Sequence, residues 1–63
     1  MNINLLRKYK KDNNLSYSQI AEQSGLNQPT VWRTLNEKSV PTIDTLQKLV
    51  SITGGKITIN DII

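Results

Sequence analysis

A glycine between two short helical segments constrains the fold of this chain more than any other sequence feature. Gly25 follows the segment 16–24, in which Ser16 and Gln19 have the S-x-x-Q spacing of a helix capping box. A glycine after a helix adopts the left-handed conformation at the lowest cost and lets the chain reverse sharply. The sequence therefore predicts that one helix ends at about Ser24 and that another begins directly after a tight turn.

The second of these helices is predicted over about residues 28–36. Asn27 can cap its first turn, and Pro29 falls within that turn, where its missing N–H has no helical partner to lose. At about 100° per residue, Val31 and Leu35 share an inward face. The other arc of the helix carries the side chains of Gln28, Pro29, Trp32, Arg33 and Asn36.

Two further helices are predicted on either side of this pair. The segment 3–13 places apolar side chains on one side and basic ones mostly on the other. Asn13 and Asn14 can end it, because asparagine tolerates the left-handed conformation that stops a helix. Thr42 can cap a later helix that runs up to a stop at Gly54-Gly55.

The tail 56–63 fits two structures. Its first isoleucines alternate as in a strand, whereas Thr58 and Asp61 can start a last helical turn, which we favour. The predicted fold is then all-α, a compact bundle of four to five short helices. We expect one domain over residues 1–63, because a chain of this length has no room for a second core.

The composition argues against an enzyme. The chain has no cysteine and no histidine, which removes thiolate nucleophiles, imidazole bases and the usual zinc ligands. Its 5 acidic residues are scattered, and no two have the spacing of a catalytic carboxylate pair or a metal cage. We therefore expect no catalytic site, no metal, no cofactor and no small-molecule substrate.

The sequence shows neither a membrane span nor a secretion signal. No apolar run approaches the roughly 18 residues of a membrane-spanning helix, and the N-terminus lacks a basic region followed by a long apolar stretch and a cleavage site. We expect a cytoplasmic protein with no membrane partner. The net charge of +3 suits a polyanionic partner but is too small to identify one.

The outward arc of the segment 28–36 offers the groups that read base edges in the major groove of DNA. Gln28 can pair with adenine, Arg33 with guanine O6 and N7, and Pro29 or Trp32 can contact a thymine methyl. A lone glutamine or arginine on a helix is usually a solvated residue, but their cluster after a tight glycine turn favours DNA reading. Trp32 lies at the border of the two faces, where core packing and DNA contact are equally supported.

The stretch IAEQSGLNQPTVWRTLN resembles the helix-turn-helix of the phage Cro and repressor type. The resemblance covers about residues 5–54, and its matching pieces are Ala21, Gly25 and Val31 at packing positions, Pro41 before the fourth helix, and the L-x-x-L-V spacing within that helix. It implies a lambda-repressor-like bundle of five helices that binds a double-stranded DNA operator as a homodimer. The third helix would then lie in the major groove.

The resemblance also implies which residues contact DNA. Base contacts come from the start and the middle of the third helix, here Asn27, Gln28, Pro29, Trp32 and Arg33. Phosphate contacts come from the start of the second helix and the loop after the third, here Ser16, Tyr17, Asn36 and Lys38. A helix N-terminus presents free N–H groups to a phosphate, which agrees with the second set.

Some positions depart from the family pattern. Tyr17 stands where the family often has a glutamine, and Glu37 stands where a glycine commonly follows Asn36. Many members pair an arginine of the first helix with a glutamate of the third. The aligned residues here are Lys10 and Leu35, so we expect that ion pair to be absent.

The first helix carries a basic cluster, which consists of Arg7, Lys8, Lys10 and Lys11. The cluster could form a second phosphate contact. We favour a solvated face, because charge runs on a helix usually are solvated. Arg7 could also pair locally or reach the DNA flank.

We expect a sequence-specific DNA-binding transcriptional regulator, a Cro-like repressor of phage or prophage origin that occupies an operator as a dimer. One alternative is an antitoxin that also binds a partner protein. Another is an interaction module that kept the bundle and lost DNA reading, with Trp32 and the tail 57–63 as apolar anchors. A basic amphipathic peptide on an anionic membrane is disfavoured.

The isoleucines of the tail allow two interpretations, which the sequence supports equally. They could be buried between two copies, with half-sites about 34 Å apart on DNA. They could instead close the core of one copy. A chain this short buries only about 60% of its unfolded surface, so stabilisation by a second copy is plausible.

Overall fold

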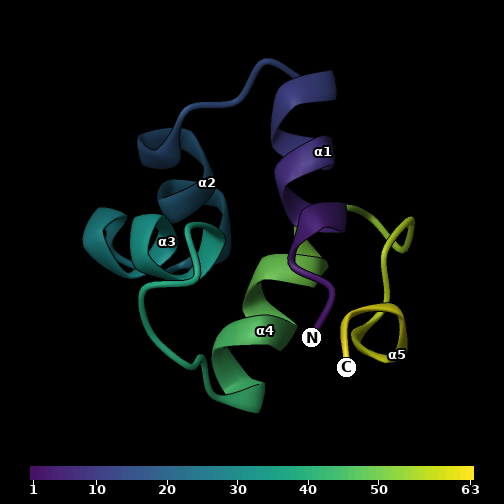
Figure 1. Ribbon diagram of the computed structural model, residues 1–63. Coiled ribbons are helices and arrows are strands. Elements are labelled where there is room, and N and C mark those ends of the chain that lie inside the picture. The colour runs from purple at the N-terminus through teal and green to yellow at the C-terminus, as the bar shows by residue number, and fades with distance from the viewer.

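The structure, a computed structural model, describes residues 1–63 and consists of five helices without a strand (Figure 1). The helices are α1 (Asn4–Asp12), α2 (Tyr17–Ser24), α3 (Gln28–Leu35), α4 (Ile43–Ser51) and α5 (Ile59–Ile62). The prediction of an all-α bundle is confirmed, and the tail forms the short fifth helix. None of these helices has the length and apolar character that a membrane span requires.

The predicted capping residues begin α2, α3 and α4. The Ser16 hydroxyl accepts from the Gln19 N–H at 3.0 Å, and the Ser16 N–H donates to Gln19 Oε1 at 2.8 Å. This reciprocal pair is the predicted capping box. The side chains of Asn27 and Thr42 cap α3 and α4 in the same way, each accepting an N–H three residues on. Local hydrogen bonding therefore sets where these helices start.

Residues in the left-handed conformation follow α1, α2 and α3. They are Asn14 (φ 52°), Gly25 (φ 78°) and Glu37 (φ 55°). The N–H after each one bonds back to a carbonyl near the helix end, which is typical of a Schellman stop: Leu15 to Lys10 at 3.0 Å, Leu26 to Ala21 at 3.1 Å and Lys38 to Arg33 at 2.8 Å. The stops at Asn14 and Gly25 were predicted. The third falls on a glutamate, for which this conformation costs roughly 1–2 kcal/mol.

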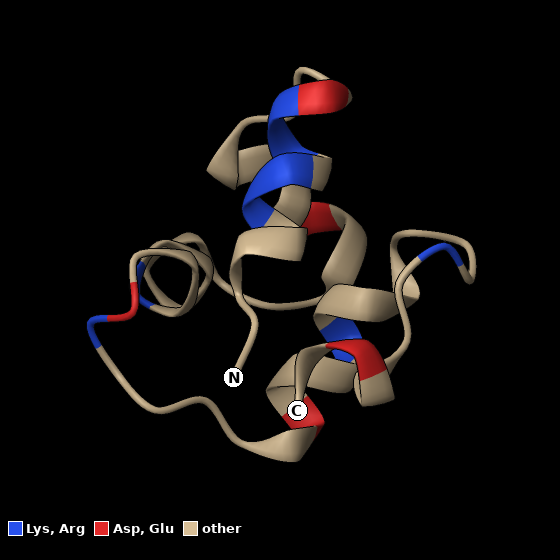
Figure 2. Ribbon diagram, turned by 45° about the vertical axis from the view of Figure 1, so that its right-hand side comes forward, with Lys and Arg blue, Asp and Glu red and all other residues tan.

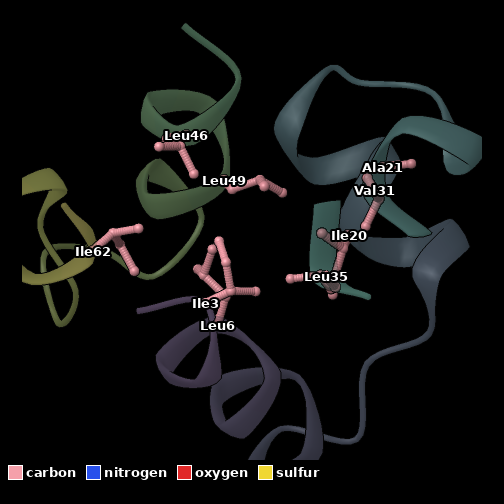
Figure 3. Packing of buried hydrophobic residues seen from close by; sticks show 9 residues of the cluster. All are labelled: Ile3, Leu6, Ile20, Ala21, Val31, Leu35, Leu46, Leu49 and Ile62. Carbon is pink, nitrogen blue, oxygen red and sulfur yellow. The ribbon is translucent and has the colours of Figure 1, made fainter. Parts of the chain in front are cut away.

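Nine apolar side chains form the core where α1, α2, α3, α4 and α5 meet (Figure 3). They are Ile3, Leu6, Ile20, Ala21, Val31, Leu35, Leu46, Leu49 and Ile62. Val31 and Leu35 are 0% and 2% exposed, so the inward face predicted for α3 is confirmed. In Figure 3, Leu49 of α4 lies between the side chains of α2 and α3 and those of α1 and α5. The core thus holds the Val31 and Leu35 face of α3 against α2, and the opposite face of α3 stays exposed.

α4 ends at Ser51, earlier than the stop predicted at Gly54-Gly55. The reason is Thr53, which is buried and whose hydroxyl donates to the Val50 carbonyl at 2.7 Å. The same hydroxyl accepts from the Ile57 N–H at 3.1 Å. A threonine side chain therefore closes the end of the helix, and the two glycines, both at positive φ, turn the chain toward α5.

α5 closes the bundle next to the N-terminal end of the chain. The Asp61 carboxylate accepts from the Thr58 N–H at 2.9 Å, as the predicted helical turn requires. The Asn2 N–H donates to the Ile62 carbonyl at 2.6 Å, so the ends marked N and C lie close together in Figure 1. Ile62 is buried and the first two isoleucines of the tail pack against the core, which leaves only Ile63 exposed. The structure therefore favours the interpretation that the tail closes the core of one copy.

Candidate nucleic-acid interface

The outer side of α3 is a continuous polar and aromatic surface. Gln28, Pro29, Trp32 and Arg33 line an open hollow of about 420 Å³ there. Trp32 is 44% exposed and does not belong to the core cluster, and the other three side chains are exposed. The helical spacing thus predicted correctly which side chains α3 turns outward. It placed Trp32 between the inward and outward faces, and in the structure Trp32 lies on the outward one.

Asn27 and Ser16 both act first as helix caps. The Asn27 Oδ1 accepts from the Thr30 N–H at 2.9 Å, so the side-chain oxygen is used within the chain while its NH₂ group has no partner. The Ser16 oxygen is used in the same way by Gln19. Both residues are exposed at the N-terminal ends of their helices. What remains free on each is a donor, the type of group that an anionic or carbonyl oxygen accepts from.

Tyr17 and Asn36 join the start of α2 to the end of α3. The Asn36 Nδ2 donates to the Tyr17 Oη at 3.3 Å and to the Trp32 carbonyl at 2.9 Å. Because the Tyr17 oxygen accepts here, its own proton is available to another acceptor. The Lys10 ammonium lies 4.4 Å from the centre of the Tyr17 ring, a cation–π distance. The structure thus brings two of the predicted phosphate-contact residues together. Lys10, which was expected to be solvated, lies against one of them.

The other two predicted phosphate contacts stand apart from this pair. Lys38 is exposed in the loop after α3, and Ser16 is exposed before α2. Neither side chain bonds to Tyr17 or Asn36. The predicted phosphate set therefore forms one connected pair and two separate exposed residues.

Arg7 connects α1 to the end of α3. Its Nε donates to the Leu35 carbonyl, and its Nη1 donates to Asn4 Oδ1 at 2.9 Å. Its Nη2 lies 3.3 Å from Glu37 Oε2 and forms an ion pair with it. The structure thus joins α1 to the loop after α3 by an ion pair that the alignment of Lys10 with Leu35 did not predict.

The basic cluster of α1 divides into two pairs. Lys8 and Lys11 are exposed and take part in no ion pair, as expected for a solvated face. Arg7 is exposed but also pairs within the chain, which is the local pairing allowed for it, whereas Lys10 is only partly exposed and lies against the Tyr17 ring. Figure 2 shows the blue segments concentrated on α1, and a blue and a red segment side by side in the loop after α3.

The acidic side chains act separately in the structure. Glu37 pairs with Arg7, Asp44 pairs with Lys48 at 3.2 Å, and Asp61 caps α5. No group of three or more acidic side chains lies close enough together to hold a metal ion.

Comparison with known proteins identifies the part of the chain that contains α2 and α3. A family model described as helix-turn-helix matches residues 6–60, a range that contains α2, α3 and the turn between them. No curated protein and no solved structure matches the chain.

Proposed function

This chain belongs to the helix-turn-helix family of DNA-binding regulators, which includes the phage Cro and repressor type, and from that premise we propose that it is a Cro-like transcriptional repressor of phage or prophage origin. Residues 1–63 act as one DNA-binding unit. α3 enters the major groove of an operator, and the bound protein blocks transcription because it occupies the promoter. The observation that carries this proposal is the hollow on the outer side of α3, in which hydrogen-bonding and apolar groups lie together.

The proposed base contacts are Asn27, Gln28, Pro29, Trp32 and Arg33. Neither Gln28 nor Arg33 uses its side chain in a hydrogen bond or ion pair within the chain, so both are free to pair with base edges. Arg33 fits guanine and Gln28 fits adenine, while Pro29 and Trp32 offer apolar surface to a thymine methyl. Because this face of α3 carries both hydrogen-bonding and apolar side chains, it can contact several different bases.

The proposed phosphate contacts are Ser16, Tyr17, Asn36 and Lys38. The bond from Asn36 to Tyr17 supports this assignment, because it holds the Tyr17 hydroxyl in place before DNA arrives. Contacts of this kind set the position of α3 in the groove and carry no sequence information.

The proposed operator-bound form is a homodimer whose half-sites lie about 34 Å apart. Since most of the tail is used inside one copy, the exposed large apolar side chains available to a second copy, apart from Trp32 on the proposed base-reading face, are Met1, Val40, Ile43 and Ile63. A stable interface takes about 800 Å² from each partner. That is a large share of a total surface of 4010 Å². We therefore expect the pair to form mainly on DNA.

Selection of binding sites from random duplexes at two salt concentrations tests the proposal. We expect a two-fold symmetric site with half-site centres about 10 base pairs apart. Sedimentation at several protein concentrations, with and without the selected duplex, then measures the oligomeric state. A strict monomer on the selected duplex contradicts the dimer.

An interaction module that has lost DNA reading is the second candidate, and the exposure of Trp32 favours it. A half-exposed tryptophan is also a frequent anchor of protein interfaces. The same selection separates the two functions. Binding that stays weak and equal for all sequences supports the module and contradicts the repressor.

A further inference from the structure

Glu37 occupies a backbone position that favours glycine. It has φ 55°, and two main-chain bonds hold it there, from its own N–H to the Thr34 carbonyl at 3.2 Å and from the Lys38 N–H to the Arg33 carbonyl at 2.8 Å. A strained residue persists where its surroundings impose the conformation, and such residues gather at functional sites. The side chain of Glu37 therefore calls for an explanation beyond the turn itself.

The only partner of the Glu37 side chain is Arg7, whose guanidinium is held in a fixed orientation. The Nε bond to the Leu35 carbonyl and the Nη1 bond to Asn4 set the plane of the guanidinium group. A guanidinium has five N–H donors, so one on each Nη remains free when these two bonds and the bond to Glu37 are made. The Arg7 side chain is still 41% exposed. It presents an ordered, accessible fork that suits an oxyanion.

The position of this ion pair matters, because Glu37 lies between Asn36 and Lys38, both proposed phosphate contacts. A carboxylate there repels a phosphate unless another group neutralises it. Arg7 does so in the free protein at a distance of 3.3 Å, and that pair is solvent-exposed on both sides. A carboxylate and a phosphodiester are both acceptors for the same guanidinium N–H groups, so they compete for Arg7.

We propose that Arg7 is a further binding site for a DNA backbone phosphate and that Glu37 occupies this site in the free protein. This inference rests on the proposed function. When a duplex binds, a phosphodiester oxygen replaces Glu37 Oε2 at Arg7 Nη2, while the Nε bond to the Leu35 carbonyl stays in place. Because the exchange has to be made on every duplex, Glu37 lowers the affinity for all sequences, and only an operator with its base contacts binds tightly.

The dependence of the binding constant on salt concentration tests this exchange, because it counts the net number of salt ions released on binding. Each contact adds about −0.9 to the slope of log K against log salt concentration. Glu37→Gln removes the charge that pairs with Arg7 and leaves only a weaker amide acceptor, so we expect several-fold tighter binding to a duplex of random sequence. In the wild type, the carboxylate that Arg7 releases takes up a salt cation, which offsets the cation that Arg7 displaces from the phosphate. Glu37→Gln takes up no such cation, so we expect a slope steeper by up to about 0.9.

Glu37→Asp separates pairing from charge. It keeps the negative charge in the loop but is one methylene shorter, so its carboxylate no longer reaches Arg7. We expect a steeper slope from this variant as well. Glu22→Gln is the matched control, since Glu22 is an exposed acid on α2 without an ion pair, and its slope should equal that of the wild type.

The double variant Arg7→Gln, Glu37→Gln decides whether Arg7 is the group released. We expect its slope to return to that of the wild type. A double variant that keeps the steep slope shows that Glu37 merely repels DNA, and it overturns the proposal, as does an unchanged slope in both single variants. Should Arg7→Gln lose its helical circular dichroism, the comparison of Glu37→Asp with Glu37→Gln decides alone. A wild type that binds no duplex contradicts the proposed function, whereas a wild type that binds with slopes unaffected by these variants contradicts only the exchange at Arg7.

Discussion

The Nε of Arg7 in α1 donates to the main-chain carbonyl of Leu35, the last residue of α3, across a sequence separation of 28. The final carbonyls of a helix have no partner within it. The three before Leu35 are satisfied by the chain that follows: Trp32 by the Asn36 N–H, Arg33 by the Lys38 N–H and Thr34 by the Glu37 N–H. Arg7 supplies the remaining donor, so a side chain of α1 completes the C-terminal end of the helix that carries the proposed base contacts.

Arg7→Gln should therefore destabilise the bundle. Leaving the Leu35 carbonyl without its partner costs about 1–3 kcal/mol. Urea unfolding followed by circular dichroism measures the loss. Lys8→Gln is the control, because Lys8 is the exposed neighbour without an ion pair, and it should change the free energy of unfolding by no more than about 0.5 kcal/mol. Equal losses in the two variants would contradict a role for Arg7 at the end of α3.

Glu37→Gly should be more stable than Glu37→Ala. Both variants remove the ion pair with Arg7, so their difference isolates the backbone at φ 55°. Glycine adopts this conformation without strain, and we expect an advantage of about 1 kcal/mol. Thermal unfolding should show this as a melting temperature higher by roughly 4–8 °C. If alanine proves as stable as glycine, the chain does not keep the left-handed turn after α3.

Tyr17→Phe should weaken binding to every duplex while changing stability little. The ring and its contact with Lys10 remain, and only the hydroxyl that bonds to Asn36 is lost. The free energy of unfolding should fall by no more than about 1 kcal/mol. Tyr9→Phe is the control, because it removes a comparable bond, from Tyr9 to the Ile52 carbonyl at 3.3 Å, away from α3. Equal DNA affinities of the two variants would argue against Tyr17 as a phosphate contact.

Arg33→Ala should remove discrimination at a single base pair. Loss of a bidentate pair with guanine costs about 1–3 kcal/mol on the preferred duplex and less on a duplex that lacks that guanine. Binding titrations against the selected duplex and its single-base variants measure both effects. Operator binding that is unchanged by Arg33→Ala means that the reading face has been assigned to the wrong side chains.

Lys38→Ala should lower the affinity for all sequences alike. A lost phosphate contact also flattens the slope of log K against log salt concentration by about 0.9. Lys56→Ala provides the comparison, since Lys56 is an exposed cation in the turn before α5 and outside the proposed contacts. A loss confined to one sequence would assign Lys38 to a base instead of a phosphate.

The start of each helix from α2 to α5 could be predicted from the sequence because it depends on residues three positions apart. Ser16 with Gln19 and Thr58 with Asp61 form their bonds within one turn, so their spacing alone specifies the geometry. The outward face of α3 was predictable for a similar reason, since a helix repeats at a fixed angle. These features define the helix-turn-helix and its exposed face.

The connections between helices were not predictable in this way. The bonds of Arg7 to Leu35 and of Asn36 to Tyr17 depend on how the helices cross, and residue spacing does not determine that crossing. The left-handed conformation of Glu37 was missed because a glutamate does not indicate such a turn. A glycine at this position, which the family pattern commonly has, would have indicated it. The site therefore differs from its sequence prediction mainly where α1 meets the ends of α2 and α3.

The half-exposed position of Trp32 has a practical consequence for measurement. It is the single tryptophan of the chain and already 44% exposed in the folded state. Its emission wavelength should therefore shift little on denaturation, and fluorescence is a poor monitor of folding for this protein. Any molecule that covers the outer side of α3 removes water from the indole, so the same emission offers a label-free signal for occupancy of that surface.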